Sequence, residues 1–204
     1  MGFYIDKTED LATFFGEEYY NSINYVDYKS RIEKYQRTTL DFISYFGITN
    51  NDSILDYGCA MGLLLDGFHK QGISKLTGFD ISEWAVSNSI NPSLHLSTDF
   101  DIVSNPYEYT FALDVFEHMF DNSIGDVLTL LNTKQLVVRL PVKVEGGGDY
   151  FLEVSRKDKS HVNCKTKGQW IDFIESRGYR FQATLALDSV YDSKGCFCGY
   201  FIKA

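Results

Sequence analysis

Acidic side chains stand where four short apolar segments of the sequence end. They are Asp56, Asp80, Asp99 and Asp114. If the apolar segments are parallel strands, their carboxyl ends meet at one edge of a sheet, where open α/β sheets bind their ligands. Several carboxylates at one edge favour a ligand that is positively charged and rich in hydroxyl groups. We therefore expect a binding site for such a ligand there.

A glycine-containing turn follows the first apolar segment. Residues 56–62 read D-Y-G-C-A-M-G, and Gly58 and Gly62 allow a tight turn whose backbone can approach a ligand closely. A dinucleotide-binding loop has the pattern G-x-G-x-x-G, which Ala60 and Leu63 interrupt. Asp56 would also repel a pyrophosphate, whereas it suits an ammonium group. An oxidoreductase that uses a dinucleotide is thus the weaker alternative.

The next two strand ends carry groups that suit a nucleoside. Asp80 lies 24 residues after Asp56, where its carboxylate could accept hydrogen bonds from both ribose hydroxyls. Asp99 and Phe100 offer a polar group and an aromatic ring to the edge and face of an adenine.

Together these residues resemble the class I S-adenosylmethionine-dependent methyltransferases. The family's first motif, acid-x-Gly-x-x-x-Gly, matches residues 56–62, and its ribose-binding acid matches Asp80, although Ala60 replaces a middle glycine. The resemblance covers residues 50–204 and implies a Rossmann-like α/β fold with a seven-stranded, mostly parallel sheet, an antiparallel last strand, helices on both faces and an N-terminal helical extension. It also implies S-adenosylmethionine as cofactor, contacted by Asp56, Gly58, Cys59, Gly62, Asp80, Ile81, Asp99, Phe100 and Asp114.

The fourth apolar segment leads into the first candidate for catalysis. Its end reads D-V-F-E-H over residues 114–118 and is similar to the D-V-L-E-H segment of many small-molecule methyltransferases. This similarity places Asp114 near the methionine end of the cofactor and His118 in the substrate cleft. Because an imidazole titrates near neutral pH, we predict His118 as the general base. Alternatively, Glu117 and His118 only cap and orient the following helix.

A long irregular stretch at residues 143–163 provides the second candidate. Its sequence Asp158-x-x-His161, followed by Thr166 and Trp170, resembles the acceptor-covering loop of the same methyltransferase branch. Long loops in compact domains are often functional lids. We predict His161 as the second catalytic residue, with Asp158 as the carboxylate that orients it. The alternative is a solvated, charged loop.

Apolar periodicity predicts the elements that must position these groups. We expect strands at 53–57, 75–81, 94–98, 109–116 and 136–142, and helices at 62–71, 82–89, 121–131 and 166–176, the last capped by Thr166. Two more strands, 179–190 and 196–203, are expected around a hairpin turn at 191–195. Two helices are expected within 11–46, and Tyr19, Tyr20, Tyr25 and Tyr28 are candidates for a wall of the acceptor pocket. The prediction is one domain, with a helical cap at 1–50 and a Rossmann-like core at 51–204.

The composition limits the partners. The chain of 204 residues has 19 Lys and Arg against 28 Asp and Glu, a net charge of −9, which disfavours a nucleic-acid backbone as partner. No segment approaches the roughly 18 apolar residues of a membrane span, and the four cysteines lack zinc-site spacing. We expect a cytoplasmic protein with reduced thiols. The oligomeric state is open, and the chain can be one domain of a longer polypeptide.

The predicted activity is O-methylation of a small-molecule or glycan acceptor. A sugar hydroxyl is favoured because the site is based on histidine, the surface is acidic and aromatic, and residues 158–161 are similar to methyltransferases of polysaccharide synthesis. A quinone, lipid or natural product is the alternative acceptor, ranked lower because no apolar helix is evident near the cleft. A non-catalytic cofactor-binding domain is a further alternative. Asp114, Glu117 and Asp158 are acids that could hold a divalent cation, but no metal site is assigned.

Overall fold

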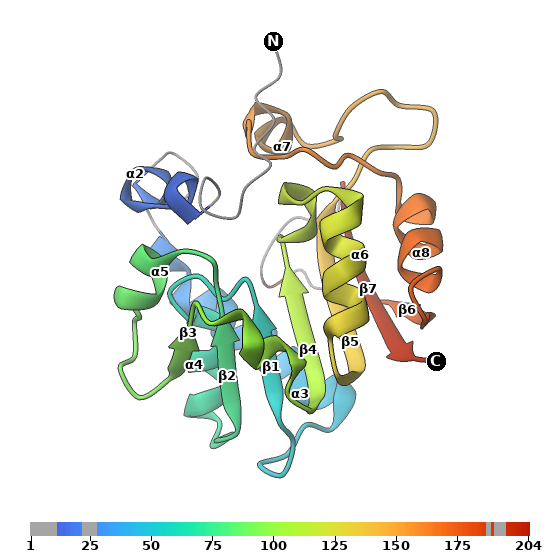
Figure 1. Ribbon diagram of the computed structural model, residues 1–204. Helices are drawn as coiled ribbons and strands as arrows, with labels where there is room; N and C mark the ends of the chain where they lie inside the picture. The colour runs from blue at the N-terminus through green and yellow to red at the C-terminus, as the bar shows by residue number, and fades with distance from the viewer. Residues whose placement is uncertain (1–11, 22–27, 187–188, 190–194) are drawn as a thin grey trace.

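Seven strands form a single sheet in the order β3-β2-β1-β4-β5-β7-β6. The computed structural model in Figure 1 describes residues 12–21, 28–186, 189 and 195–204. Neighbouring strands are parallel, except that β7 runs antiparallel to both β5 and β6. The expected fold is confirmed, with the reversed strand placed inside the sheet and β6 at its edge. The strands are β1 (Ile54–Tyr57), β2 (Leu76–Phe79), β3 (His95–Ser97), β4 (Tyr107–Leu113), β5 (Thr133–Pro141), β6 (Tyr179–Thr184) and β7 (Cys196–Lys203).

The strand ends differ from the sequence-based prediction at functionally important places. β4 ends at Leu113 instead of at residue 116 because Asp114 adopts a left-handed conformation with φ of +58°, which an extended strand does not contain. β6 ends at Thr184, well before the predicted residue 190. Most of the predicted hairpin turn, residues 191–194, lies outside the described residues.

Helices cover both faces of the sheet, as the buried parallel strands require. On one face, Phe42 of α3 (Ile32–Phe46) and Phe68 of α4 (Leu63–Lys70) pack against Phe111 of β4, with ring centroids 4.6 and 5.4 Å apart. On the other face, α6 (Asp121–Leu130) and α8 (Lys167–Glu175) bury Leu128 and Trp170. Two apolar layers therefore hold the sheet rigidly between them.

The beginning of α8 shows how the local sequence sets a helix boundary. The Thr166 hydroxyl accepts a hydrogen bond from Gln169 N at 3.2 Å, and the Gln169 side chain accepts one from Thr166 N at 2.9 Å. This reciprocal capping box satisfies two backbone donors that the first helical turn would leave unpaired. The predicted cap at Thr166 is confirmed.

Short elements gather beyond the carboxyl ends of the parallel strands. The single-turn helices α2 (Glu17–Tyr20) and α7 (Glu153–Lys157) lie above this edge in Figure 1. α7 falls in a stretch that we expected to be irregular. The remaining elements are α5 (Glu83–Ser87) and three 3₁₀ helices, η1 (Tyr28–Arg31), η2 (Phe100–Ser104) and η3 (Phe116–His118). None of the helices in the described ranges combines the length and apolar character that a bilayer crossing needs.

The contact between α3 and α4 depends on a glycine. A Cβ atom on Gly67 of α4 would lie 2.2 Å from the Thr39 hydroxyl oxygen of α3. We expect Gly67→Ala to lower the free energy of unfolding by about 1–3 kcal/mol through overpacking, although alanine favours a helix. Urea unfolding measures the change. Gly168→Ala in α8, where the nearest atom would be 3.7 Å away, is the matched control and should not destabilise. Equal stability of both variants would contradict this packing.

Candidate active site

The turn after β1 has the backbone conformation of a close-approach loop. Gly58 and Gly62 have φ values of +81° and +84°, and a Cβ on Gly58 would lie 2.4 Å from a methyl group of Val115. Ala60, at the family's middle glycine position, is also left-handed, with φ of +47°. Its backbone N–H donates to Asp80 Oδ2 at 2.7 Å. The second strand thus fixes the turn from β1 through a buried carboxylate.

Asp56 and Asp80 form a pair of buried carboxylates beneath this turn. Asp56 is 4% exposed and Asp80 is 7% exposed. Burial, together with the charge of Asp80, raises the pKa of Asp56 to about 8. Burial also raises the pKa of Asp80 to about 6, while hydrogen bonds from the Ser82 and Ala60 backbone oppose the shift. Two desolvated carboxylates are stabilised by a ligand that brings a positive charge and hydrogen-bond donors.

The other predicted cofactor residues lie around the same edge. Asp99 is exposed and caps η2, where its side chain accepts a hydrogen bond from Asp101 N at 3.0 Å. The neighbouring Phe100 ring is also largely exposed and packs edge-on against Phe79 at 5.4 Å. Cys59 is buried and Ile81 is half-buried. The ends of β1, β2 and β3 therefore bring the predicted groups together.

Asp114 forms an ion pair with Arg139 of β5. Both carboxylate oxygens accept from Arg139 Nη1, at 2.6 and 2.9 Å, and Asp114 N donates to the Arg139 carbonyl at 2.7 Å. The Arg139 side chain is 4% exposed, so its charge depends on a nearby carboxylate. This pairing fixes Asp114 in the turn after β4. The Asp114 side chain also lines the cavity described next.

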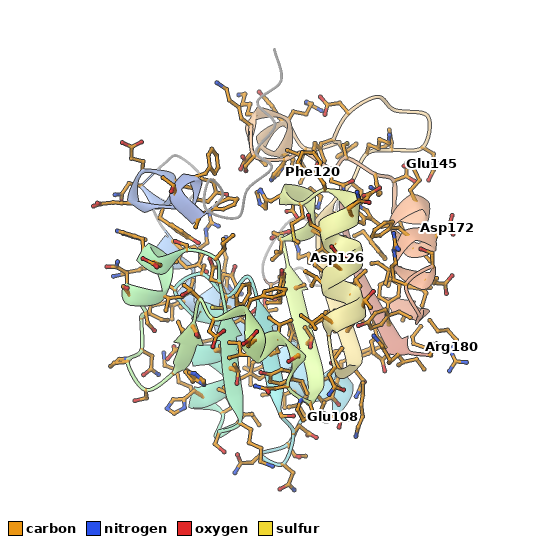
Figure 2. All side chains as sticks on the ribbon, viewed as in Figure 1. Glu108, Phe120, Asp126, Glu145, Asp172 and Arg180 are labelled. Carbon is orange, nitrogen blue, oxygen red and sulfur yellow. The ribbon has the colours of Figure 1, made fainter. Side chains whose placement is uncertain are left out.

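A cavity of about 120 Å³ opens at this edge. Both predicted catalytic histidines, the Asp114–Arg139 pair and several apolar side chains line it. The lining residues are Tyr19, Arg31, Asp114, Glu117, His118, Arg139, Pro141, Leu152, Val154, Ser155, Asp158, His161 and Cys196. Figure 2 locates this end of the molecule, with Phe120 at the beginning of α6 near the cavity end and Glu108 at the opposite end of β4.

Tyrosines of the N-terminal segment contribute to the site in different ways. Tyr19 lines the cavity, as expected. Tyr20 is buried and stacks on Trp84 with ring centroids 5.3 Å apart, and Tyr28 is likewise buried. Tyr25 lies outside the described residues. Among the described tyrosines of this segment, Tyr19 is the one at the cavity wall.

A hydrogen-bonded relay links His118 to Asp158 through Ser160. The Ser160 hydroxyl lies 2.5 Å from Asp158 Oδ1 and 2.8 Å from His118 Nδ1. A hydroxyl has one proton, and the carboxylate can only accept it, so Ser160 must accept a hydrogen bond from His118 Nδ1–H. The Nε2 lone pair of His118 therefore remains available. Burial and the neighbouring His161 lower the pKa of His118 to about 4, which keeps this ring neutral and makes it a weaker base than the near-neutral imidazole expected from the sequence.

His161 lies beside His118, with ring centroids 4.8 Å apart. Its Nε2 is 3.7 Å from Asp158 Oδ2, and burial lowers the pKa of His161. Both His161 and Asp158 have side chains only 10% exposed, so these two groups are not solvated, whereas Arg156, Lys157 and Lys159 of the same stretch are exposed. Asp158 makes its short contact with Ser160 instead of with His161.

Glu117 occupies the buried side of the same cluster. It is 1% exposed, and its carbonyl accepts hydrogen bonds from Val162 N and Asn163 N at 2.9 and 3.1 Å. The alternative that Glu117 and His118 cap the following helix is wrong, because α6 begins after Phe120 without a side-chain cap. Glu117 thus ties the 158–163 loop to the end of β4.

Sequence reasoning did not identify two residues of this site. Ser160 connects the two catalytic candidates, and Arg139 neutralises Asp114. The arginine had a detectable signal, since a charge within an apolar strand is rarely buried without a partner. No signal in the sequence indicated the role of Ser160, because the conformation of its loop sets the distance between Ser160 and His118.

Comparison with known proteins identifies the class. A family model described as a methyltransferase domain matches residues 29–137, more than half of the chain. With the fold and the glycine turn described above, this match shows that the chain belongs to the class I S-adenosylmethionine-dependent methyltransferases.

The individual relatives have low sequence identity to this chain. The ubiquinone biosynthesis O-methyltransferase of Hydrogenovibrio crunogenus is 21% identical over 183 residues, which cover 84% of this chain and 71% of the relative. Magnesium protoporphyrin IX methyltransferase from Synechocystis, solved with bound SAM, superposes with a TM-score of 0.65 at 14% identity, covering 100% of both chains. The methyltransferase domain of a bacterial Hen1 protein gives a TM-score of 0.59 at 16% identity, covering 83% of this chain and 98% of that one. The chain is thus similar to methyltransferases that differ in their acceptors.

The cofactor of this class fits the residues present. S-adenosylmethionine carries a sulfonium, an ammonium group and ribose hydroxyls, and the edge offers two desolvated carboxylates, Asp56 and Asp80, next to a turn that excludes a side chain at Gly58. Buried carboxylates gain from a ligand that brings a positive charge and hydroxyl donors.

The Asp114–Arg139 pair should be essential for stability. We expect Asp114→Ala to lower the free energy of unfolding by about 3–5 kcal/mol, since it leaves a buried guanidinium without this carboxylate and puts alanine at a left-handed position. Asp114→Asn, which tolerates that conformation, should cost less, and Asp114→Asn with Arg139→Met should recover much of the loss. Urea unfolding measures all three. A loss below about 1 kcal/mol for Asp114→Ala would show that the pair does not hold the turn.

The buried Asp56 predicts a pH dependence of stability. Its raised native pKa, about 8, means that the ligand-free native state keeps a proton that the unfolded state loses near pH 4. Stability should therefore fall as the pH rises from about 4 to about 8. Asp80 of β2 and Tyr35 of α3 interact with this carboxyl group and remain in the variant.

The test compares the wild type with Asp56→Asn by urea unfolding at pH 5 and pH 8. We expect the variant to gain on the order of 2 kcal/mol relative to the wild type over this interval. Asp101→Asn, at an exposed carboxylate, is the control and should run parallel to the wild type. An Asp56→Asn curve that also runs parallel would refute the desolvation of Asp56.

Proposed function

We propose that this methyltransferase transfers a methyl group from S-adenosylmethionine to a hydroxyl of a small aromatic acceptor of the hydroquinone or catechol kind. The observation that carries the proposal is the cavity of about 120 Å³, lined by His118 and His161, at the strand ends that carry the cofactor turn. Its volume suits about one ring, since a cavity near 150 Å³ can hold benzene. The preference for an aromatic ring over a sugar ring comes from the side chains at the cavity, described below.

The cofactor is proposed to lie along the ends of β1, β2 and β3. In this proposal Asp56 faces the ammonium group, Asp80 accepts hydrogen bonds from the ribose, and Asp99 with Phe100 contacts the adenine. Bound there, the cofactor supplies a methyl group on a positively charged sulfur, which leaves as a neutral thioether when the acceptor oxygen takes the methyl. Asp114, at the end of the neighbouring strand β4, lines the acceptor cavity.

The histidines are proposed to receive the acceptor hydroxyl. The relay through Ser160 and Asp158 places the proton of His118 on Nδ1 and leaves Nε2 as a lone pair. In the absence of any further ligand, His118 Nε2 takes the proton that the hydroxyl loses. Asp158 then stabilises the positive charge on the imidazole through Ser160, and His161 offers a second acceptor beside it.

Apolar side chains at the mouth support an aromatic or quinone-like acceptor over a sugar. Leu152 and Val154 line the cavity, and Val154 is 55% exposed. Phe151 beside them is 46% exposed. Sequence reasoning ranked a quinone lower because no apolar helix was evident near the cleft. α7 is itself largely charged, but Leu152, directly before it, and Val154 within it place apolar side chains at the cavity. The relative that acts in ubiquinone biosynthesis agrees with this choice, whereas no comparison supports a glycan.

Methyl transfer from labelled S-adenosylmethionine to a panel of acceptors tests the proposal. We expect label on a catechol or hydroquinone and none on free sugars or nucleotide-sugars. His118→Ala should lower kcat by about 10²-fold or more, while His95→Ala, at an exposed histidine of β3, should leave it unchanged. Cofactor binding measured by calorimetry should persist in both variants.

The same assay can refute each part of the proposal. Label on a sugar with none on the phenols would overturn the acceptor class. Unchanged kcat in His118→Ala would overturn the role of the histidine. Cofactor binding without transfer to any acceptor of the panel would favour a non-catalytic domain.

A further inference from the structure

Three side chains that line the cavity lie close enough to share one ion. One donor atom each from Glu117, His118 and His161 lies within 4.8 Å of the other two. Two of these residues also have buried polar atoms without a hydrogen-bond partner in the described structure, namely Glu117 Oε2 and His161 Nδ1. Glu117 is 1% exposed. Buried polar atoms without partners are rare in folded proteins, so this pair points to a missing ligand.

The hydrogen bonds around the histidines leave one lone pair on each ring. His118 donates from Nδ1 to Ser160, as derived above, which leaves Nε2 as an acceptor. His161 hydrogen-bonds the Ser155 backbone and lies near Asp158, whereas its Nδ1 has no partner. The proton of His161 therefore belongs on Nε2. Metal-binding histidines commonly have this arrangement, in which the other ring N–H is held by a carboxylate, carbonyl or hydroxyl.

The charges around Glu117 also favour the binding of a cation. The carboxylates of Asp114 and Asp158 line the same cavity as Glu117. Arg139 also lines it, but Asp114 already holds the Arg139 guanidinium at 2.6 Å. A cation at Glu117 would satisfy this carboxylate and both imidazole lone pairs together.

We propose that Glu117, His118 and His161 bind one divalent transition-metal cation whose open coordination positions face the acceptor cavity. Two imidazoles and one carboxylate are a donor set that suits Zn²⁺, Mn²⁺, Fe²⁺ and Co²⁺ and leaves positions for other ligands. Asp158 and Ser160 form the supporting shell that fixes His118 and so the shape of the site.

The metal site would act on the acceptor of the proposed methyl transfer, and its catalytic role therefore rests on the proposed function. The oxygen of the acceptor hydroxyl would occupy an open position and lose its proton to water more readily, because coordination lowers the pKa of a bound hydroxyl. Two neighbouring hydroxyls on one ring would occupy two positions, which favours a catechol over a single phenol. His118 would then serve as a ligand, in place of its role as a free base.

Metal binding can be measured without any methyl transfer. The full chain is stripped with a chelator, dialysed and titrated with Co²⁺ by visible absorption and with Zn²⁺ by calorimetry. We expect one equivalent to bind and the melting temperature to rise. Glu117→Gln should weaken binding at least about 30-fold, since it removes the charged ligand, and Asp158→Asn should weaken it by about 10–100-fold through the supporting shell. His95→Gln, at an exposed histidine, is the matched control and should bind as the wild type does.

A second measurement keeps the proposal testable if a variant folds poorly. In the metal-free protein Glu117→Gln should raise the melting temperature, because it removes a buried carboxylate that lacks a partner. The same variant should lose the rise that Zn²⁺ gives the wild type. No metal binding, or binding that Glu117→Gln leaves unchanged, overturns the site.

The failure of this inference differs from the failure of the proposed function. Full methyl transfer to a catechol in excess chelator, without metal binding, overturns the metal site and leaves His118 as the base. One bound metal that depends on Glu117, with no transfer to any phenol, supports the site and overturns the proposed acceptor.

Discussion

The ion pair in which Arg139 Nη1 contacts both carboxylate oxygens of Asp114 is the constraint on which the site depends. Arg139 lies in β5 with a buried side chain, so it requires a carboxylate at the end of the adjacent strand. Meeting it forces Asp114 into a left-handed conformation and ends β4 at Leu113. The chain then turns sharply enough for η3 to present Glu117 and His118 over the sheet edge. Without this pair, a continued strand would send both side chains elsewhere.

The loop of residues 158–163 is held in place by the same turn. The Glu117 carbonyl accepts two backbone N–H groups from Val162 and Asn163, which brings His161 against His118. Ser160 then joins His118 to Asp158. Two histidines from distant parts of the sequence thus become one cluster through main-chain hydrogen bonds, and their lone pairs converge because their ring N–H groups are already engaged.

The N-terminal segment closes the site from the other side. The Phe15 carbonyl accepts a hydrogen bond from the Ser82 hydroxyl at 2.5 Å, and its ring lies 5.4 Å from that of His118. Tyr20 stacks on Trp84 above the glycine turn. The burial of Asp56 and Asp80 raises their pKa values and increases the benefit of binding a cationic ligand. A site that excludes water also protects methyl transfer from a competing acceptor.

The sheet, its reversed strand, the capped helix at Thr166 and the glycine turn with Asp56 and Asp80 could be predicted from the sequence. Apolar periodicity, turn chemistry and the resemblance to a methyltransferase motif indicate these features, and each depends on residues that are near one another in the chain. The sequence also indicated His118 and His161 as residues of interest. Three-dimensional packing alone buries Glu117 beside these histidines, connects His118 to Asp158 through Ser160, and pairs Arg139 with Asp114. Those contacts join residues that are far apart in the chain. Their separation in the sequence does not determine how the loop at residues 158–163 is oriented against the end of β4. A buried carboxylate becomes a site only when packing has removed its water and placed two lone pairs beside it.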